Sequence, residues 1–397
     1  GVIIRNGGAN NEGYWGGNQK LNGNGLLDIN PENIETINIL KGAAASALYG
    51  SDATFGVIVI TTKNGKGFNK GVGVELNLSA NNDNVAITPD LQTEYGPGYD
   101  RGTNLGAFGS DDEGWIHETV NGQAVVRPIF RAYGQFGPKL DGRQVYWWDG
   151  QMRAYTPQED NWKAFYRTGY STIANLAINN ATDKMNYRFS YTRNDYKGIQ
   201  IGGKQEKNTF SFNSSYKIVP KVTLDVVASY INEKVHNRPR QIYYLTNNFG
   251  GFFSPAEHMD VLFNKYQTTK AYKWVDYNQT QLDPEEALKY NIRPKDFLDF
   301  LWNQLANNYD GTTEGLIAST TLNYNILQGL NLRGRFGTDY TGYLQESKFR
   351  STQPLSFGAT GGYTVDNNRY MFTYGDLLLS YTRSIVKDLN MTASVGY

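Results

Sequence analysis

Residues able to carry out acid–base, nucleophilic or metal chemistry are scarce in this sequence. It has no cysteine, and its three histidines, His117, His236 and His258, stand at no metal-ligand spacing. No serine lies in a G-x-S-x-G elbow. The acidic triplet at 111–113 offers carboxylate oxygens to a cation, but a solvated run of charge is the more ordinary interpretation. We therefore predict no catalytic site, no metal and no cofactor.

Aromatic residues in stretches rich in Gly and Asn are better candidates for function. Flat aromatic faces stack on sugar rings or peptide side chains, and neighbouring Asn, Gln and Asp supply orienting hydrogen bonds. The alternative is that these rings pack the long loops against one another or face lipid headgroups. The predicted substrate-binding residues are Tyr14, Trp15, Tyr95, Trp147 and Trp148, with Tyr146 and Trp162 in a similar setting.

The composition of the chain excludes several classes of protein. Among 397 residues, 38 Lys and Arg balance 38 Asp and Glu, so we predict no nucleic-acid partner. The absence of Cys removes disulfides, Cys-ligated zinc and iron–sulfur clusters. No apolar run is long enough for a transmembrane helix. Transmembrane β-strands hide their apolar residues in alternation, and a mean hydropathy of −0.55 is compatible with them.

The secondary-structure elements that position these residues belong to two parts of the chain with different sequence patterns. The first part is a small α/β unit near the start of the chain. Asn30 and Pro31 predict a helix start, with Asn as the N-cap. The glycines at 42 and 50 superficially resemble a phosphate-binding loop, but no Gly-Lys-Ser/Thr follows them. The unit is predicted to contain, in order, a strand at 36–40, an Ala-rich helix at 43–49 ended by Gly50, and a buried strand at 56–63.

From residue 72 onward, apolar and polar residues alternate with a period of two, which is typical of strands with one face of each kind. Val74 and Leu76, for example, oppose Glu75 and Asn77. Several segments approach the length that a tilted membrane-spanning strand requires. We expect about nine strands, at 72–80, 172–178, 185–191, 210–216, 222–230, 316–326, 330–340, 370–381 and 389–397.

Alternation alone does not separate a membrane barrel from a soluble sandwich, but the connections do. Tight turns alternate with long links along the chain, so the turns gather at one end of the strands and the links at the other. Outer-membrane barrels have this asymmetry, and Tyr residues near the strand ends fit their aromatic girdles. We expect inward-facing polar residues to line the lumen or hold the preceding domain, among them Glu75, Asn77, Arg188, Arg333 and Arg335.

The long links are expected to contain structure of their own. Helix-start patterns at 254–257 and 283–286, and apolar residues at helical spacing across 294–305, predict a folded lobe. Both ends of the sequence read as strand interiors, so we expect it to be part of a longer chain. The long links predicted to be extracellular are 81–170, 232–312 and 344–366.

The sequence closely resembles SusC/RagA-type TonB-dependent outer-membrane transporters through residues 28–50, DINPENIETINILKGAAASALYG, and their continuation at 56–66. Residues 136–142 and 160–170 are similar to the family's early barrel-loop motif and to the segment before its second barrel strand. Gly42 departs from the family, which has Asp there. The plug-domain signature is carried by Asn30, Pro31, Lys41, Gly42, Tyr49, Gly50 and Gly56.

The resemblance implies the C-terminal part of a plug domain at 1–67 and the N-terminal portion of a transmembrane β-barrel at 68–397, with roughly 22 strands in the complete barrel. The fold class is then mainly β, with a small α/β plug followed by antiparallel strands. The resemblance also implies TonB-dependent import of an oligosaccharide or oligopeptide across the bacterial outer membrane, without enzymatic activity. The loop aromatics favour a glycan. Implied partners are the TonB–ExbB–ExbD system, a SusD-like surface lipoprotein, outer-membrane lipid, and a second copy of the two-protein complex in a dimer.

Two other functions stay open. One is an outer-membrane receptor or scaffold barrel that binds without transport, which would lack a TonB-contacting segment. The other is a soluble β-rich carbohydrate-active enzyme, which requires paired carboxylates. The direction of the apolar faces distinguishes barrel from enzyme: a barrel turns Val74, Leu76, Phe189 and Leu224 outward, whereas a soluble sandwich packs them together in a dry core.

Overall fold

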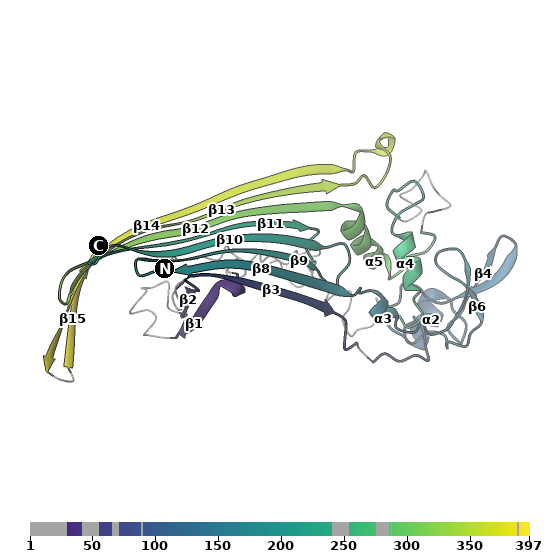
Figure 1. Ribbon diagram of the computed structural model, residues 1–397. Coiled ribbons are helices and arrows are strands. Elements are labelled where there is room, and N and C mark those ends of the chain that lie inside the picture. The colour runs from purple at the N-terminus through teal and green to yellow at the C-terminus, as the bar shows by residue number, and fades with distance from the viewer. Residues whose placement is uncertain are drawn as a thin grey trace.

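A computed structural model describes residues 30–41, 55–65, 71–88, 90–239, 254–274, 286, 288–386 and 389–397. Its main feature is a 9-stranded antiparallel sheet whose strands pair in the order in which they occur along the chain, with β3 next to β8. The sheet is long and curved (Figure 1). Its strands are β3 (Gly71–Asp83), β8 (Gly169–Ala181), β9 (Met185–Lys197), β10 (Lys204–Val219), β11 (Val222–His236), β12 (Asn308–Leu327), β13 (Leu330–Phe349), β14 (Gly362–Val386) and β15 (Leu389–Gly396).

The connections are sorted by length as predicted. Tight turns join β8 to β9, β10 to β11 and β12 to β13, and they lie at one end of the sheet (Figure 1). The long links leave from the other end. Gly329 in the β12–β13 turn has a φ of 81°, and a Cβ there would lie 2.2 Å from the carbonyl oxygen of Thr382. Only glycine fits that turn without strain.

The two faces of the sheet have the predicted chemistry. Val74 and Leu76 are 66% and 64% exposed, and Phe189 is 42% exposed. On the opposite face Arg188 and Ser190 are 2% and 1% exposed. The apolar side chains therefore do not meet in a dry core, and the polar side chains are the covered ones. This arrangement confirms the predicted fold class and argues against a soluble sandwich.

The strands extend further than the hydropathy pattern predicts. β12 and β13 have 20 residues each, whereas alternation indicated 316–326 and 330–340. The additional β12 residues are mostly polar, such as Asn308, Asp310 and Thr312, and they continue to pair with β13. Backbone pairing needs no apolar face, so the ladder continues where both faces are polar.

The described part of the α/β unit is a short turn and a two-stranded sheet. Its elements are η2 (Pro31–Asn33), β1 (Ile34–Leu40) and β2 (Val57–Thr62), and β1 pairs antiparallel with β2. The Asn30 side chain accepts a hydrogen bond from the Glu32 amide at 3.1 Å, which confirms the N-cap. The helix is only one 3₁₀ turn because the β-branched run of β1 begins at once. The predicted helix at 43–49 lies outside the described residues.

A folded lobe lies beyond the long-link end of the sheet (Figure 1). We use "the lobe" for the described residues of the β3–β8 link, 84–168, and of the β11–β12 link, 237–307. A further short turn, η5 (Leu355–Phe357), lies in the β13–β14 link. The lobe contains α2 (Arg101–Phe108), β4 (Ile116–Val120), β5 (Gln123–Arg127), β6 (Gln144–Tyr146), β7 (Met152–Ala154), α3 (Asn161–Ala164), α4 (Met259–Lys265), α5 (Lys295–Leu301) and η4 (Trp302–Ala306).

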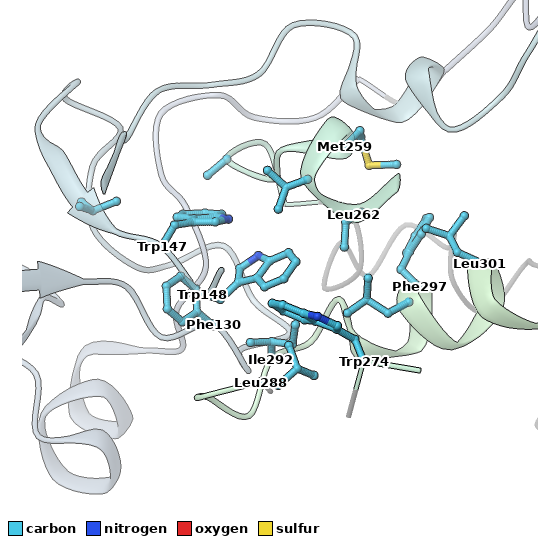
Figure 2. Packing of buried hydrophobic residues seen from close by; sticks show 14 of the residues in the cluster. Phe130, Trp147, Trp148, Met259, Leu262, Trp274, Leu288, Ile292, Phe297 and Leu301 are labelled. Carbon is cyan, nitrogen blue, oxygen red and sulfur yellow. The ribbon is translucent and has the colours of Figure 1, made fainter. Parts of the chain in front are cut away.

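The lobe has a hydrophobic core to which both links contribute. Figure 2 shows Phe130, Trp147 and Trp148 from the first link facing side chains of the second link. The ring centroids of Trp148 and Trp274 lie 6.0 Å apart in an edge-on arrangement. No helix among the described residues combines the length and apolar content needed to cross a membrane.

The predicted helix at 294–305 is confirmed by α5 and η4, with Phe297, Leu298, Leu301 and Trp302 buried. The pattern at 254–257 instead forms a turn, and α4 begins at Met259. Of the pattern at 283–286, only residue 286 lies within the described part of the chain.

Candidate functional site

The polar face of β8, β9 and β10 holds the turn that precedes β1. Asn33 is 4% exposed and lies against this face. Its Nδ2 donates to the Ser211 hydroxyl at 2.9 Å, and the Ser190 hydroxyl donates to its Oδ1 at 2.8 Å. One asparagine therefore uses both ends of its amide to join β9 and β10. We call residues 30–33 and 63–65, together with the sheet residues that contact them, the plug seat.

Neighbouring contacts widen the plug seat. The Asn30 amide donates to the Thr192 hydroxyl at 2.5 Å, and the Asn213 amide donates to the Lys63 carbonyl at 2.7 Å. A Cβ on Gly65 would lie 2.6 Å from the carbonyl oxygen of Tyr187, so the chain leaving β2 runs against the sheet backbone. Nearly all of these bonds join uncharged groups, and each contributes a net of only about 0.5–1.5 kcal/mol, because water replaces it when the groups separate.

The wall beside the plug seat carries an ion pair. Arg188 Nη1 lies 2.9 Å from Glu75 Oε2, and Asn179 contacts both residues. Asn77 donates to Glu32 Oε2 at 3.2 Å, so it contacts the turn directly, as expected for an inward-facing polar residue. The expected lining role of Arg333 and Arg335 is consistent with their shared partner, Asp376 in β14.

The plug-signature residues have traceable roles where they are described. Asn30 caps η2 and Pro31 occupies its first position. Lys41 is exposed just after β1. Gly56 has a φ of 109°, and a Cβ there would lie 2.9 Å from the Leu40 carbonyl oxygen, so the entry to β2 requires glycine. Gly42, Tyr49 and Gly50 lie outside the described residues.

The aromatic residues predicted to bind substrate lie in different surroundings in the structure. Trp147 and Trp148 are each 1% exposed, and Trp148 Nε1 donates to Glu257 Oε1 at 3.0 Å. Their burial favours the alternative in which they pack the two links together, so the argument for a glycan loses these two rings. Tyr95 is 44% exposed and lines a cleft. Tyr14 and Trp15 lie outside the described residues.

Two clefts open on the lobe. The first cleft has a volume of about 430 Å³ and is built entirely from the β3–β8 link. The second cleft, of about 460 Å³, lies between that link and Pro255. Both volumes are in the range of ligand sites. The first is lined by, among others, Tyr95, Arg101, Asp112, Phe136, Lys139 and Arg143, and the second by Asp90, Gln158, Asn161, Trp162, Lys163 and Pro255.

A pair of Gly-Pro segments adjoins the first cleft, and Gly137 of the second segment lines it. Gly96 donates to the Pro138 carbonyl at 3.0 Å, and Gly137 donates to the Gly96 carbonyl at 3.1 Å. A Cβ on Gly137 would lie 2.1 Å from the Pro97 carbonyl oxygen, and one on Gly98 would lie 2.3 Å from Gly137 Cα. The two backbones therefore touch with no room for a side chain. We call residues 95–98 and 134–138 the clasp.

Replacing Gly137 with alanine is expected to destabilise the lobe by about 2 kcal/mol, because the added methyl group overlaps backbone rather than a movable side chain. Faster proteolysis of the lobe in the full-length protein measures the effect. Gly106→Ala is the matched control: nothing lies within 4 Å of its Cβ position in α2, so that helix should be unchanged or slightly stabilised. Equal proteolysis rates for the two variants would contradict the role of the clasp.

The acidic triplet is used in structure rather than chemistry. Asp111 Oδ1 accepts hydrogen bonds from the amides of Glu113 and Trp115, and Asp112 pairs with Arg101 at 2.7 Å. Asp111 also contacts His117. Hydrogen bonds from His117 and from these amides hold the pKa of Asp111 below its usual value, although burial opposes them. In the part of the chain that the structure describes, no group of His, Asp and Glu could hold a metal ion.

Sequence reasoning missed the residues at the centre of the plug seat. A signal was present, because Ser190 and Ser211 are polar positions opposite Phe189 and Phe210 in two strands with clean alternation. It also missed Glu257, which is 3% exposed inside the lobe. Burial raises the pKa of this carboxyl to about 8. A single glutamate two residues after a proline gives no sequence signal of burial.

Comparison with known proteins agrees with this geometry. Residues 2–57 match the family model of the TonB-dependent receptor plug domain. TonB-dependent receptor SusC of Bacteroides thetaiotaomicron is 25% identical over 370 residues, covering 91% of this chain and 32% of the relative. A TonB-dependent receptor of Formosa agariphila is 26% identical over 321 residues, 73% of this chain and 29% of the relative. The chain thus spans about a third of the length of these relatives.

Solved structures show the same fold. Structures of the RagAB peptide importer in its closed-closed state and of the RagAB peptide transporter each superpose with a TM-score of 0.61. Sequence identity is 16% and 18%, and each alignment covers 93% of this chain and 38% or 39% of the other.

A plug-domain match at residues 2–57, followed by a curved antiparallel sheet with its apolar face outward, makes this chain similar to a segment of TonB-dependent receptors. Among these receptors, the chain is similar in sequence to SusC and shares the fold of the RagAB structures.

Proposed function

We propose that the full-length protein imports a nutrient across the bacterial outer membrane by TonB-driven displacement of the plug. In this proposal residues 1–67 are the C-terminal part of the plug domain and 68–397 the N-terminal portion of the barrel. The observation that carries it is the plug seat, where few and mostly uncharged hydrogen bonds hold residues 30–33 on the lumen face. Such a contact is specific at rest and releases with modest work.

The energy source and the partners follow from the same picture. The outer membrane has no ATP and no ion gradient, so the work of release comes from the inner membrane through TonB, ExbB and ExbD. A SusD-like surface lipoprotein docks on the lobe and helps to bind the substrate, and two such complexes pair as a dimer. The substrate is an oligosaccharide or an oligopeptide; the RagAB neighbours are described as peptide importers.

A reversible tether across the plug seat tests the proposal. Asn77 donates to Glu32 at 3.2 Å, and this chain has no native cysteine. In the Glu32→Cys/Asn77→Cys variant, a short bis-methanethiosulfonate reagent is expected to fix the plug to β3. Uptake of labelled peptide and oligosaccharide pools should then fall at least tenfold and recover when dithiothreitol cuts the link.

The single-cysteine variants, treated with the same reagent, are the controls and should transport as the untreated protein does. Full uptake by the tethered double variant would mean that the turn stays in place during transport. That result would overturn displacement of the plug, whereas saturable ligand binding without uptake by the unaltered protein would favour the second candidate, a receptor or scaffold barrel that binds without transport.

A further inference from the structure

Two aromatic rings stand exposed on a fixed backbone in the first cleft. Phe136 is 74% exposed, yet its amide donates to the Gly98 carbonyl at 3.2 Å and its carbonyl accepts from the Asn104 side chain at 3.3 Å. Tyr95 is fixed on both sides by Gln92, which accepts from its amide at 2.8 Å and donates to its carbonyl at 2.6 Å. Large rings on a rigid backbone lose little entropy on binding, so they are typical of recognition surfaces.

Charges of both signs surround the two rings. Arg101 and Asp112 form an ion pair at 2.7 Å, with side chains 72% and 75% exposed. Arg143 lies 2.7 Å from Asp141 and 3.7 Å from Glu113. Exposed ion pairs are weak, so a ligand carrying the matching charges can take over either partner. The Lys139 ammonium, also in the lining, has no ion-pair partner among the described residues.

Two exposed rings surrounded by charges of both signs favour some classes of ligand over others. An uncharged oligosaccharide offers hydroxyl hydrogen bonds but no charge to Lys139 or to the exchangeable ion pair. A polyanionic one meets the carboxylates of Asp112 and Glu113, which repel it. A peptide has carboxylates and ammonium groups, and also apolar side chains that fit between two aromatic rings.

We propose that the first cleft binds a short peptide that bears charges of both signs and places an apolar side chain against Tyr95 and Phe136. The proposal rests on the import function above and names its substrate class. The clasp fixes the cleft in advance, because backbone hydrogen bonds donated by Gly96, Gly98 and Gly137 join its two segments. The peptide therefore meets a site that is already formed.

Binding to the full-length protein in detergent tests the proposal by calorimetry. The probes are an unblocked octapeptide with the repeat Ala-Lys-Phe-Glu, the same peptide with blocked termini and Gln for Lys and Glu, and maltoheptaose. We expect saturable binding of the charged peptide, at least tenfold weaker binding of the uncharged peptide, and no saturable binding of maltoheptaose.

Two variants locate the binding. Tyr95→Ala/Phe136→Ala should weaken the Kd for the charged peptide at least tenfold. Arg101→Gln/Asp112→Asn keeps the net charge and should weaken it severalfold, with no change for the uncharged peptide. Phe357→Ala removes an exposed ring in η5, away from the cleft, and should leave binding unchanged. Because all these side chains are exposed, the lobe should keep its fold, which proteolysis verifies.

Three results would overturn the proposal. They are no saturable binding of the charged peptide, unchanged charged-peptide affinity in the Tyr95→Ala/Phe136→Ala variant, and maltoheptaose binding that this variant abolishes, which would assign the cleft to a glycan. None of them bears on import as such. Failure of import would appear in the Glu32–Asn77 tether experiment, which uses no residue of the first cleft.

Discussion

Cells that carry the Asn33→Ala variant of the full-length protein should become permeable to large hydrophilic antibiotics. The substitution removes the two amide bonds to Ser190 and Ser211 and leaves both hydroxyls without that partner on a covered face. Lost bonds and unpaired buried groups together amount to roughly 3 kcal/mol. At 1.4 kcal/mol per factor of ten, the released plug becomes about a hundredfold more populated. In the proposed full-length barrel of roughly 22 strands, a released plug would leave a pore without selectivity.

Vancomycin susceptibility, and single-channel conductance in planar bilayers, measure the leak. Asn38→Ala is the matched control, because Asn38 is an exposed asparagine in β1 of the same plug segment, with no side-chain hydrogen bond to the described sheet. A strain with Asn33→Ala that is no more susceptible than the Asn38→Ala strain would show that the plug seat does not hold the pore closed.

The second large effect is a pH dependence of the stability of the lobe, and Glu257 is its cause. Burial raises its pKa to about 8, from 4.5, so the folded lobe keeps the carboxyl protonated at neutral pH whereas the unfolded chain ionises it. Its contribution to stability is full below pH 4.5 and is lost as pH rises towards 8. At about 1.4 kcal/mol per pKa unit, the loss is roughly 5 kcal/mol.

Glu257→Gln should remove this dependence, because the amide keeps an acceptor for Trp148 Nε1 and cannot ionise. Hydrogen exchange of residues 254–266 should match the unaltered protein below pH 5 and be markedly slower in the variant at pH 8. His258 is the same in both proteins, so its titration affects both alike. Glu159→Gln, at an exposed position in the lobe, is the control. Parallel pH profiles for the Glu257→Gln variant and the unaltered protein would contradict the argument.

The sheet was predictable because every strand must turn one apolar face outward. This requirement appears in the sequence as an alternation of apolar and polar residues with a period of two. Val74 and Leu76 opposite Glu75 are sufficient to assign the faces of β3. The turn-and-link pattern then orders the strands. Strand ends were less predictable, since the polar residues at the start of β12, from Asn308 to Thr312, pair without an apolar face.

The lobe was harder to predict because its core depends on contacts between distant parts of the chain. Trp147 and Trp148 look like exposed loop aromatics until the second link supplies Trp274 and Leu262 to cover them. The plug seat has the same character, since Asn33 and Ser211 are 178 positions apart. Local pattern reveals that a position is polar or aromatic, but the partner that gives it a role comes from the fold.

The two-link construction of the lobe also sets the order in which the molecule assembles. Trp148 and Glu257 are 109 positions apart, and β8 to β11 lie between them in the chain. Closing so long a loop without intervening structure is slow. Hairpins such as β8–β9 and β10–β11 form locally. They bring the points where both links join the sheet to the same end of the strands. The sheet thus acts as a template, and the lobe core is among the last parts of this segment to fold.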